Sequence, residues 1–237
     1  RSSLVAVTTG SSNVAVGVNA LSTLTTTNNM VAVGQGAGFS VNHAQAEGGT
    51  FVGYEAGKSL GSAGHTTAIG YQALMTVSAN GYNTAVGSKA LKLATGISNT
   101  AVGAETLMNV TTGGYNTALG KDAGDSVTSG EKNVFVGTDS GQNTTSQSNC
   151  VFVGYEAGAT AQVSGTTGIG YQALTALTSG AGNTTVGANS LSAVTTGGNN
   201  TSLGSQAGER ITTAHNTVSV GHASGYGITT GSDNISI

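Results

Sequence analysis

The sequence predicts an all-β protein: a parallel β-solenoid (β-roll) of about fourteen coils of 17 residues each. Three observations lead to this prediction. An aliphatic residue followed by glycine recurs at a nearly constant spacing, the residues before that glycine alternate with period two, and no segment shows the sustained 3.6-residue periodicity of a helix. The repeat covers residues 1–237, so we expect a single repetitive segment without separate domains.

The repeat is defined by its anchor glycine, the glycine that follows an aliphatic residue in each unit. The consensus reads N-T-A-V-G-x-x-A-[L/G]-x-x-V-T-T-G-x-x, and the anchors lie 17 residues apart except for two spacings of 16 and one of 19. We expect each anchor to supply a turn with φ > 0 or to allow close backbone approach between coils. The anchors are Gly17, Gly34, Gly53, Gly70, Gly87, Gly103, Gly120, Gly137, Gly154, Gly170, Gly187, Gly204 and Gly221.

The three residues before each anchor predict a short strand. The last of them is always aliphatic and the first is Val or Thr, as in Val86 and Thr84, so both point to one face, which we expect to be the inner face. The residue between them, such as Ala85, then points outward. A usually aliphatic position seven residues after the anchor predicts a second inward strand; it includes Leu24, Val77, Val110, Val194, Ile211 and Ile228.

Asparagine recurs four residues before the anchor, a set of positions that we call the Asn column. Stacked asparagines can form a hydrogen-bonded ladder along the axis of a solenoid. Alternatively, each could bond to the backbone of its own turn, and the sequence leaves both possibilities open. The column contains Asn13, Asn83, Asn99, Asn116, Asn133, Asn183 and Asn200.

The position four residues after the anchor, here called the Leu/Gly column, is Leu or Gly in every coil. Phe occurs in the middle of the predicted strand only at Phe51, Phe135 and Phe152, always in coils that have Gly in this column, which indicates large–small complementarity. A thin coil of small side chains buries little surface. We therefore expect a parallel homotrimer, in which the chains are intertwined or pack side by side with this column as the contact.

Composition argues against several classes of function. The chain has 7 basic and 10 acidic residues, too few positive charges for a nucleic-acid-binding surface. It lacks a phosphate-binding loop, C-x-x-C and H-E-x-x-H, so no cofactor or metal site is predicted. With few ionisable groups an acid–base site is hard to build, and we expect no enzymatic activity and no catalytic residue. The single cysteine, Cys150, fits a small buried apolar residue. No apolar run is long enough to span a bilayer, so membrane insertion is not expected.

One surface feature suggests binding. Tyr54, Tyr71, Tyr155 and Tyr171 each follow an anchor directly and form two pairs in adjacent coils. Aromatic side chains aligned along a face can bind sugar rings or a protein partner; the alternative is that they only cover neighbouring coils. The coil of 19 residues carries its extra residues around 42–48, where we expect a loop.

The repeat runs to both ends of the sequence without a change in composition. Projected one period before Gly17 and one period past Gly221, it reaches the two termini in register. Solenoids usually need terminal caps, and neither end shows one. We therefore expect this sequence to be a window from a longer array.

Three motifs carry a resemblance to known proteins: N-T-A-V-G-S-K-A-L (83–91), N-T-A-L-G-K-D-A-G (116–124) and V-F-V-G-Y-E-A-G (151–158). They resemble the head repeats of YadA-like trimeric autotransporter adhesins, which read N-S-V-A-I-G and form left-handed parallel β-rolls in a trimer, although the period here is longer. They are also similar to repeats of phage tail-fibre and tailspike proteins that precede a self-cleaving intramolecular chaperone domain. Either resemblance implies a trimer and attachment to a cell surface.

These observations lead to a prediction of function with two alternatives. The leading expectation is a structural segment of a virion tail fibre that presents or spaces contacts to a glycan or protein receptor of the host cell. The alternative is the head of a bacterial surface adhesin. A third class, ice binding, uses flat arrays of Thr on β-solenoids, and the expected inward direction of the Thr positions argues against it.

Overall fold

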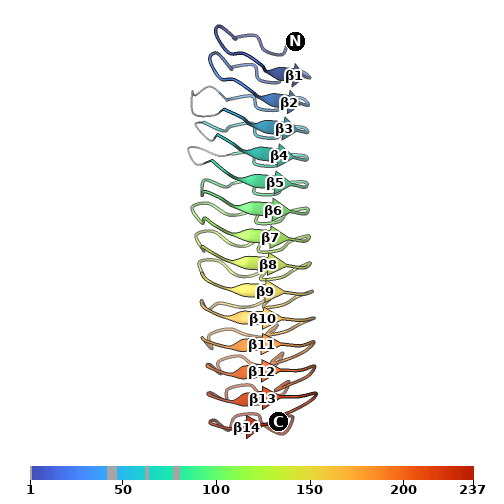
Figure 1. The fold of residues 1–237 in the computed structure, drawn as a ribbon, viewed down its shortest axis with the longest axis vertical. Helices are drawn as coiled ribbons and strands as arrows, with labels where there is room; N and C mark the ends of the chain where they lie inside the picture. Colours follow the sequence, from blue (N-terminus) through green and yellow to red (C-terminus); the bar gives the residue numbers. More distant parts are fainter. Residues whose placement is uncertain (1, 42–46, 62–63, 77–80) are drawn as a thin grey trace. The chain divides into compact units, whose positions relative to one another are not determined.

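The computed structural model describes residues 2–41, 47–61, 64–76 and 81–237, which form a β-solenoid with coils of about 17 residues (Figure 1). No helix occurs among these residues, and the strands run parallel, which confirms the predicted fold class. Each coil contributes one short strand. The strands are β1 (Val14–Val16), β2 (Val31–Val33), β3 (Thr50–Val52), β4 (Thr67–Ile69), β5 (Thr84–Val86), β6 (Thr100–Val102), β7 (Thr117–Leu119), β8 (Val134–Val136), β9 (Val151–Val153), β10 (Thr167–Ile169), β11 (Thr184–Val186), β12 (Thr201–Leu203), β13 (Val218–Val220) and β14 (Ile235–Ser236).

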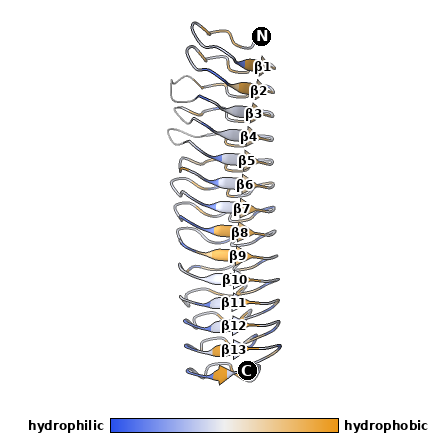
Figure 2. Cartoon of the chain, in the orientation of Figure 1, coloured by the Kyte–Doolittle hydropathy of each residue, from blue (hydrophilic) through white to orange (hydrophobic). Residues whose placement is uncertain are grey.

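The chain divides into two compact units, Arg1–Asn116 and Thr117–Ile237, built from the same kind of coil. In the first unit β1 to β6 pair in sequence order, and in the second β7 to β14 do so. The register joins equivalent repeat positions, as in Ala85 opposite Ala101 and Phe135 opposite Phe152. Like side chains therefore lie side by side within each unit, as the repeat predicts. In Figure 2, β8 and β9 stand out as hydrophobic, since both read Val-Phe-Val.

Left-handed backbone at four positions makes each coil turn tightly. These positions are the anchor, the residues two and four after it and the residue five before it; examples are Gly103 (φ 140°), Glu105 (58°), Leu107 (48°) and Tyr115 (60°). A non-glycine residue in this region costs about 1–2 kcal/mol. Hydrogen bonds between coils offset that cost, because Glu105 N donates to Ser88 O (2.8 Å) and Tyr115 N donates to Ile97 O (2.9 Å).

The anchor glycines have φ angles between 118° and 144°. An added Cβ would lie less than 3.0 Å from the backbone of the next anchor at Gly17, Gly34, Gly53, Gly70, Gly87, Gly120, Gly137, Gly154, Gly170, Gly187 and Gly204. Real Cβ atoms do not approach backbone so closely. Both physical reasons for glycine, the positive φ and the close approach of coils, therefore act at the same position.

The predicted direction of the strand residues was wrong. In β2 to β13 the middle residue is buried, and the first and last residues are half-buried or exposed. The interior of a 17-residue coil is too narrow for two columns of Val or Thr beside the buried leucines. It accepts one column, mostly of small residues (Ala, Gly, Ser and Thr), in which three Phe side chains also fit. We call the buried middle residues the inner strand column, and the first and last residues of the strands the outer columns.

The second strand predicted in each coil does not form among the described residues, where two isolated parallel bridges, Val41 with Gly61 and Ser59 with Thr76, occur in its place. Leu24, Val110, Val194 and Ile211 are buried and contribute to the core as expected, but their backbone does not form a ladder of strands. Left-handed residues two and four positions after the anchor turn the chain too sharply for an extended segment. Val77 and residues 42–46 of the predicted loop lie outside the described residues.

The Leu/Gly column lies inside the coil, which overturns its predicted role as a contact between chains. Leu21, Leu74, Leu91, Leu107, Leu174 and Leu191 are fully buried. In coils that have Gly in this column, a neighbouring Phe can occupy the space: a Cβ on Gly158 would lie 2.5 Å from Phe152 Cδ1, and one on Gly38 would lie 2.9 Å from Phe51 Cδ2. The predicted large–small complementarity is therefore real, and it operates within the core of one chain.

The Asn column forms a ladder between coils. Asn200 is fully buried; its Oδ1 accepts from Thr217 N (2.9 Å), and its Nδ2 donates to Ala214 O (2.9 Å) in the next coil. Asn99 makes the same two bonds, to Asn116 N and Gly113 O. These bonds form the ladder, although they reach mainly backbone atoms. The other possibility that the sequence left open also occurs, since Asn183 Nδ2 donates both to Gly180 O of its own turn (2.8 Å) and to Gly197 O of the next coil (2.8 Å). Cys150, in the same column, is buried and lies with its Sγ 3.3 Å from Val163 O.

Candidate functional site

The four predicted tyrosines form two stacked pairs, one in each unit. In the first unit the ring centroids of Tyr54 and Tyr71 are 5.4 Å apart with planes inclined by 10°. In the second unit Tyr155 and Tyr171 are 5.6 Å apart and inclined by 12°. All four side chains are exposed, by 41–51% of their surface. The coil places them there because each tyrosine directly follows an anchor glycine, at the turn that ends the strand.

A polar network lies beside the first tyrosine pair. Glu55 accepts hydrogen bonds from Lys58 Nζ (2.6 Å) and from Gln72 Nε2 (2.9 Å). These bonds, first that of Lys58 and then that of Gln72, lower the pKa of the Glu55 carboxyl. Further along the same side, Lys89 and Glu105 form an ion pair of 2.8 Å. The acidic and basic groups beside this pair are thus matched with each other.

The second tyrosine pair repeats the arrangement with fewer charges. Gln172 Nε2 donates to Glu156 Oε2 at 2.6 Å, as Gln72 does to Glu55. The Glu156 carboxylate raises the pKa of the neighbouring Tyr155 phenol, because it accepts a hydrogen bond from the protonated phenol and repels the phenolate. The next two coils place Asn189 and Gln206 in register with Gln172. The two tyrosine pairs therefore share a stacked geometry and a bridging Gln–Glu hydrogen bond.

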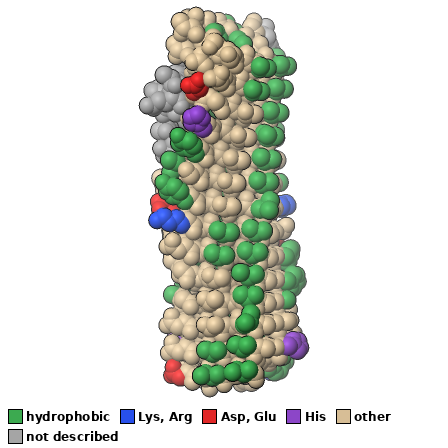
Figure 3. Space-filling model, in the orientation of Figure 1, with side chains coloured by type: hydrophobic (Ala, Val, Ile, Leu, Met, Phe, Trp, Pro, Cys, Tyr) green, Lys and Arg blue, Asp and Glu red, His purple; other side chains and the backbone are tan. Residues whose placement is uncertain are grey.

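A second candidate surface is the outer face of the strands. The outer columns contain only Val, Thr, Ile and Leu, apart from Ser236 in the shorter β14. Several of these side chains are markedly exposed, including Leu119 (50%) and Leu203 (52%). Figure 3 shows hydrophobic side chains gathered in columns on the viewed face. The first and last residues of each strand were both predicted to face inward, because β-branched and aliphatic residues are usually buried.

Metal-ligating, thiol and carboxyl side chains are the remaining candidates for chemistry among the described residues. Within them, no group of three or more His, Cys, Asp or Glu side chains is arranged to hold a metal ion. The pKa of the Cys150 thiol is raised by burial, which disfavours the reactive thiolate. Asp122, Asp125 and Asp139 lie near one another, and burial together with the Asp122 carboxylate raises the pKa values of Asp125 and Asp139.

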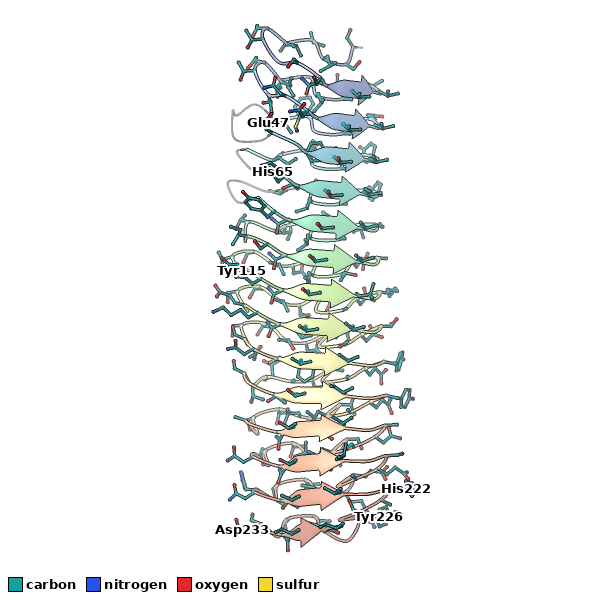
Figure 4. All side chains as sticks on the ribbon, viewed as in Figure 1. Glu47, His65, Tyr115, His222, Tyr226 and Asp233 are labelled. Atoms are coloured by element: carbon teal, nitrogen blue, oxygen red, sulfur yellow. The ribbon has the colours of Figure 1, made fainter. Side chains whose placement is uncertain are left out.

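The contact between Arg210 and Tyr226 is a further feature that was not predicted from the sequence. The guanidinium carbon of Arg210 lies 4.9 Å from the ring centroid of Tyr226. These two residues, with Glu209, Ser192 and their neighbours, line an open groove of about 460 Å³. Figure 4 shows Tyr226 and His222 on one side of the second unit and Asp233 on the opposite side. No other coil has tyrosine at this repeat position, and Phe39 is the other aromatic residue there, so the repeat itself gave no signal for Tyr226.

Comparisons with known proteins add no family assignment. No protein-family model matches the chain, and the comparison with curated proteins gave no match. Across the part of the chain that the structure describes, no helix is long and apolar enough to cross a membrane.

Proposed function

We propose that this chain is a structural segment of a virion tail fibre, which spaces or presents contacts for attachment to a host cell and has no catalytic role. The motifs at 83–91, 116–124 and 151–158 support this assignment through their resemblance to tail-fibre repeats. The coil also suits a mechanical role. Hydrogen bonds run from coil to coil through strands, turns and the Asn column, so each unit is tied along its length.

The observation that carries the proposal is the uncharged outer face of the strands. Val, Ile, Leu and Thr side chains occupy it coil after coil, and no charged side chain interrupts it. Extended apolar patches on soluble proteins mark surfaces that bind other molecules. A second and a third copy of this chain would offer the same outer columns in the same repeat. We propose a parallel homotrimer in which the outer columns, rather than the Leu/Gly column, lie between the chains.

The competing location is the surface of a bacterium, where the chain would belong to the head of a trimeric adhesin. Immunogold labelling with antibodies raised against this chain separates the two. The tail-fibre proposal predicts gold on the tails of virus particles in lysates of the source culture. Labelling confined to bacterial envelopes would overturn it in favour of the adhesin.

A second candidate function, ice binding, gains support from one observation. The first outer column contains runs of threonine, Thr50, Thr67, Thr84 and Thr100 in the first unit and Thr167, Thr184 and Thr201 in the second. These threonines lie on the outer face, so the inward direction that argued against this function is wrong. If the outer face binds ice, the chain lowers the freezing point of water below its melting point. An equal freezing and melting point at millimolar protein would eliminate this candidate.

A further inference from the structure

The tyrosine pairs recur with the same surroundings in both units, and this recurrence points to a ligand. In each pair the second ring, Tyr71 or Tyr171, has one face against its partner. The opposite face turns toward the following coils. There the position after the anchor is Ser88 and then Ala104 in the first unit, and Ala188 and then Ser205 in the second. These side chains are too short to cover an aromatic ring.

The polar groups beside each free ring face are balanced in charge. In the first unit they are Gln72 and the Lys89–Glu105 ion pair. In the second unit they are the amides of Gln172, Asn189 and Gln206, while the Glu156 carboxylate that accepts from Gln172 belongs to the preceding coil, beside Tyr155. Such surroundings favour a neutral ligand over an ionic one, because a charged ligand would find no unmatched opposite charge among these groups. Amides donate and accept hydrogen bonds, so the ligand should carry hydroxyl groups.

We propose that the free faces of Tyr71 and Tyr171 each bind one neutral pyranose ring. A pyranose has an apolar face of C–H groups that can stack on the aromatic ring. Its hydroxyl groups at the ring edge reach the neighbouring polar side chains: Gln72, Lys89 and Glu105, or Gln172, Asn189 and Gln206. The rise of about 4.8 Å per coil leaves room for one sugar ring above the first small residue. This inference rests on the proposed role in host attachment and names a glycan as the contact.

The test measures saturation transfer by NMR from the intact chain to methyl β-D-glucopyranoside, methyl β-D-galactopyranoside and N,N′-diacetylchitobiose. We expect transfer to the ring C–H protons of at least one of these sugars. Replacing both tyrosines, Tyr71→Ala with Tyr171→Ala, should weaken binding by about fivefold or more, because it removes the stacking contact. Tyr71→Phe with Tyr171→Phe keeps the ring and should keep binding.

Two further variants guard against an indirect effect. Ser88→Arg with Ala188→Arg leaves every tyrosine in place but lays a guanidinium over each free face, and it should abolish transfer. Tyr115→Ala removes an exposed tyrosine from a different repeat position and should change nothing. Absence of transfer to all three sugars, or equal transfer in the Tyr71→Ala, Tyr171→Ala variant, overturns the inference.

The pyranose site and the proposed fibre can be tested separately. The oligomeric state of the same samples is measured by sedimentation. A trimer that binds no sugar would contradict the pyranose site but not the proposed fibre. A monomer that binds sugar through the two tyrosines would support the pyranose site and contradict the side-by-side assembly.

Discussion

At the scale of single residues, two kinds of position decide whether the coil can form. The anchor glycine combines a positive φ with contact between the backbones of consecutive coils. The Leu/Gly column has positive φ in every coil and still accepts leucine, because the buried side chain gains more from the core than the backbone loses. The sequence predicted the first kind. It could not predict the second, since leucine gives no sign of a left-handed backbone.

Substitution of an anchor should cost far more than substitution of a glycine that only has positive φ. At Gly170 (φ 140°) a Cβ would collide with the carbonyl of Gly187, whereas at Gly165 (φ 68°) nothing lies within 4 Å. We expect Gly165→Ala to lower the free energy of unfolding by about 1 kcal/mol. Gly170→Ala should lower it by more than about 3 kcal/mol, because backbone must move. Urea unfolding of both variants checks this, and equal losses would contradict the role of close approach.

The pair Phe152 and Gly158 should behave as one unit. Phe152→Ala leaves a cavity and should cost about 3–5 kcal/mol. Gly158→Leu forces a side chain against the Phe152 ring and should also destabilise. The double variant recreates the Ala and Leu combination of other coils, such as Ala85 with Leu91. We therefore expect the double variant to lose at least about 1 kcal/mol less free energy of unfolding than the two single variants lose together. Additive losses in a double-mutant cycle would argue against complementarity.

At the scale of the coil, the sequence predicted the register between strands correctly, but not which strand side chains point inward. The repeat aligned equivalent residues correctly because its spacing is nearly constant, and the described strands pair in that register. The outer columns misled because Val, Ile and Leu normally point inward. The pairing of Phe in the strand with Gly in the Leu/Gly column indicated the correct direction. Side chains that compensate in size lie in the same core, so the middle strand residue and the Leu/Gly column must face each other.

The Asn column should contribute measurably to the stability of each coil. Asn200→Ala leaves the Thr217 N–H and the Ala214 carbonyl without the partners that Asn200 provides. Unpaired buried polar groups cost about 1–3 kcal/mol each, so the free energy of unfolding should fall by at least about 2 kcal/mol. Asn143→Ala, at an exposed position, serves as the matched control and should change it by less than about 0.5 kcal/mol. Thermal unfolding that shows similar losses for both would refute the ladder as a stabilising element.

Asp125 should make the stability of the second unit depend on pH. Burial, and next to it the repulsion from Asp122, raises the folded-state pKa of Asp125, while a hydrogen bond from Ser126 opposes this shift. A raised pKa means that ionisation is harder in the folded state. The carboxyl therefore destabilises the fold above its folded-state pKa, and this penalty disappears as pH falls below the unfolded value of about 3.9.

Replacement of Asp125 by asparagine isolates this effect. Asp125→Asn should raise the melting temperature at pH 7 and leave it unchanged at pH 3, relative to the parent chain at the same pH. Differential scanning calorimetry at both values provides the measurement. A variant that is less stable than the parent at pH 7 would show that the ionised carboxylate makes a favourable contact instead.

At the scale of the whole molecule, the outer face of the strands determines the proposed function. A coil that buries leucine, phenylalanine and alanine inside still exposes Leu119, Leu203 and their equivalents. The sequence predicted association, and the structure changes the surface through which we propose it. Function could be predicted only as a class, because the residues that repeat build the coil, while contacts to a receptor fall on residues that vary between coils, such as the tyrosines.

The mass of the purified chain under native conditions distinguishes a trimer from a monomer. The side-by-side assembly predicts a particle of about 69 kDa, three times the chain mass of 23.0 kDa. Leu119→Lys with Leu203→Lys places charges on the outer face and should release folded monomers with unchanged circular dichroism. Thr213→Lys, at an exposed position outside the strands, should leave the trimer intact. A parent chain that stays a stable monomer of 23.0 kDa would contradict the proposed homotrimer.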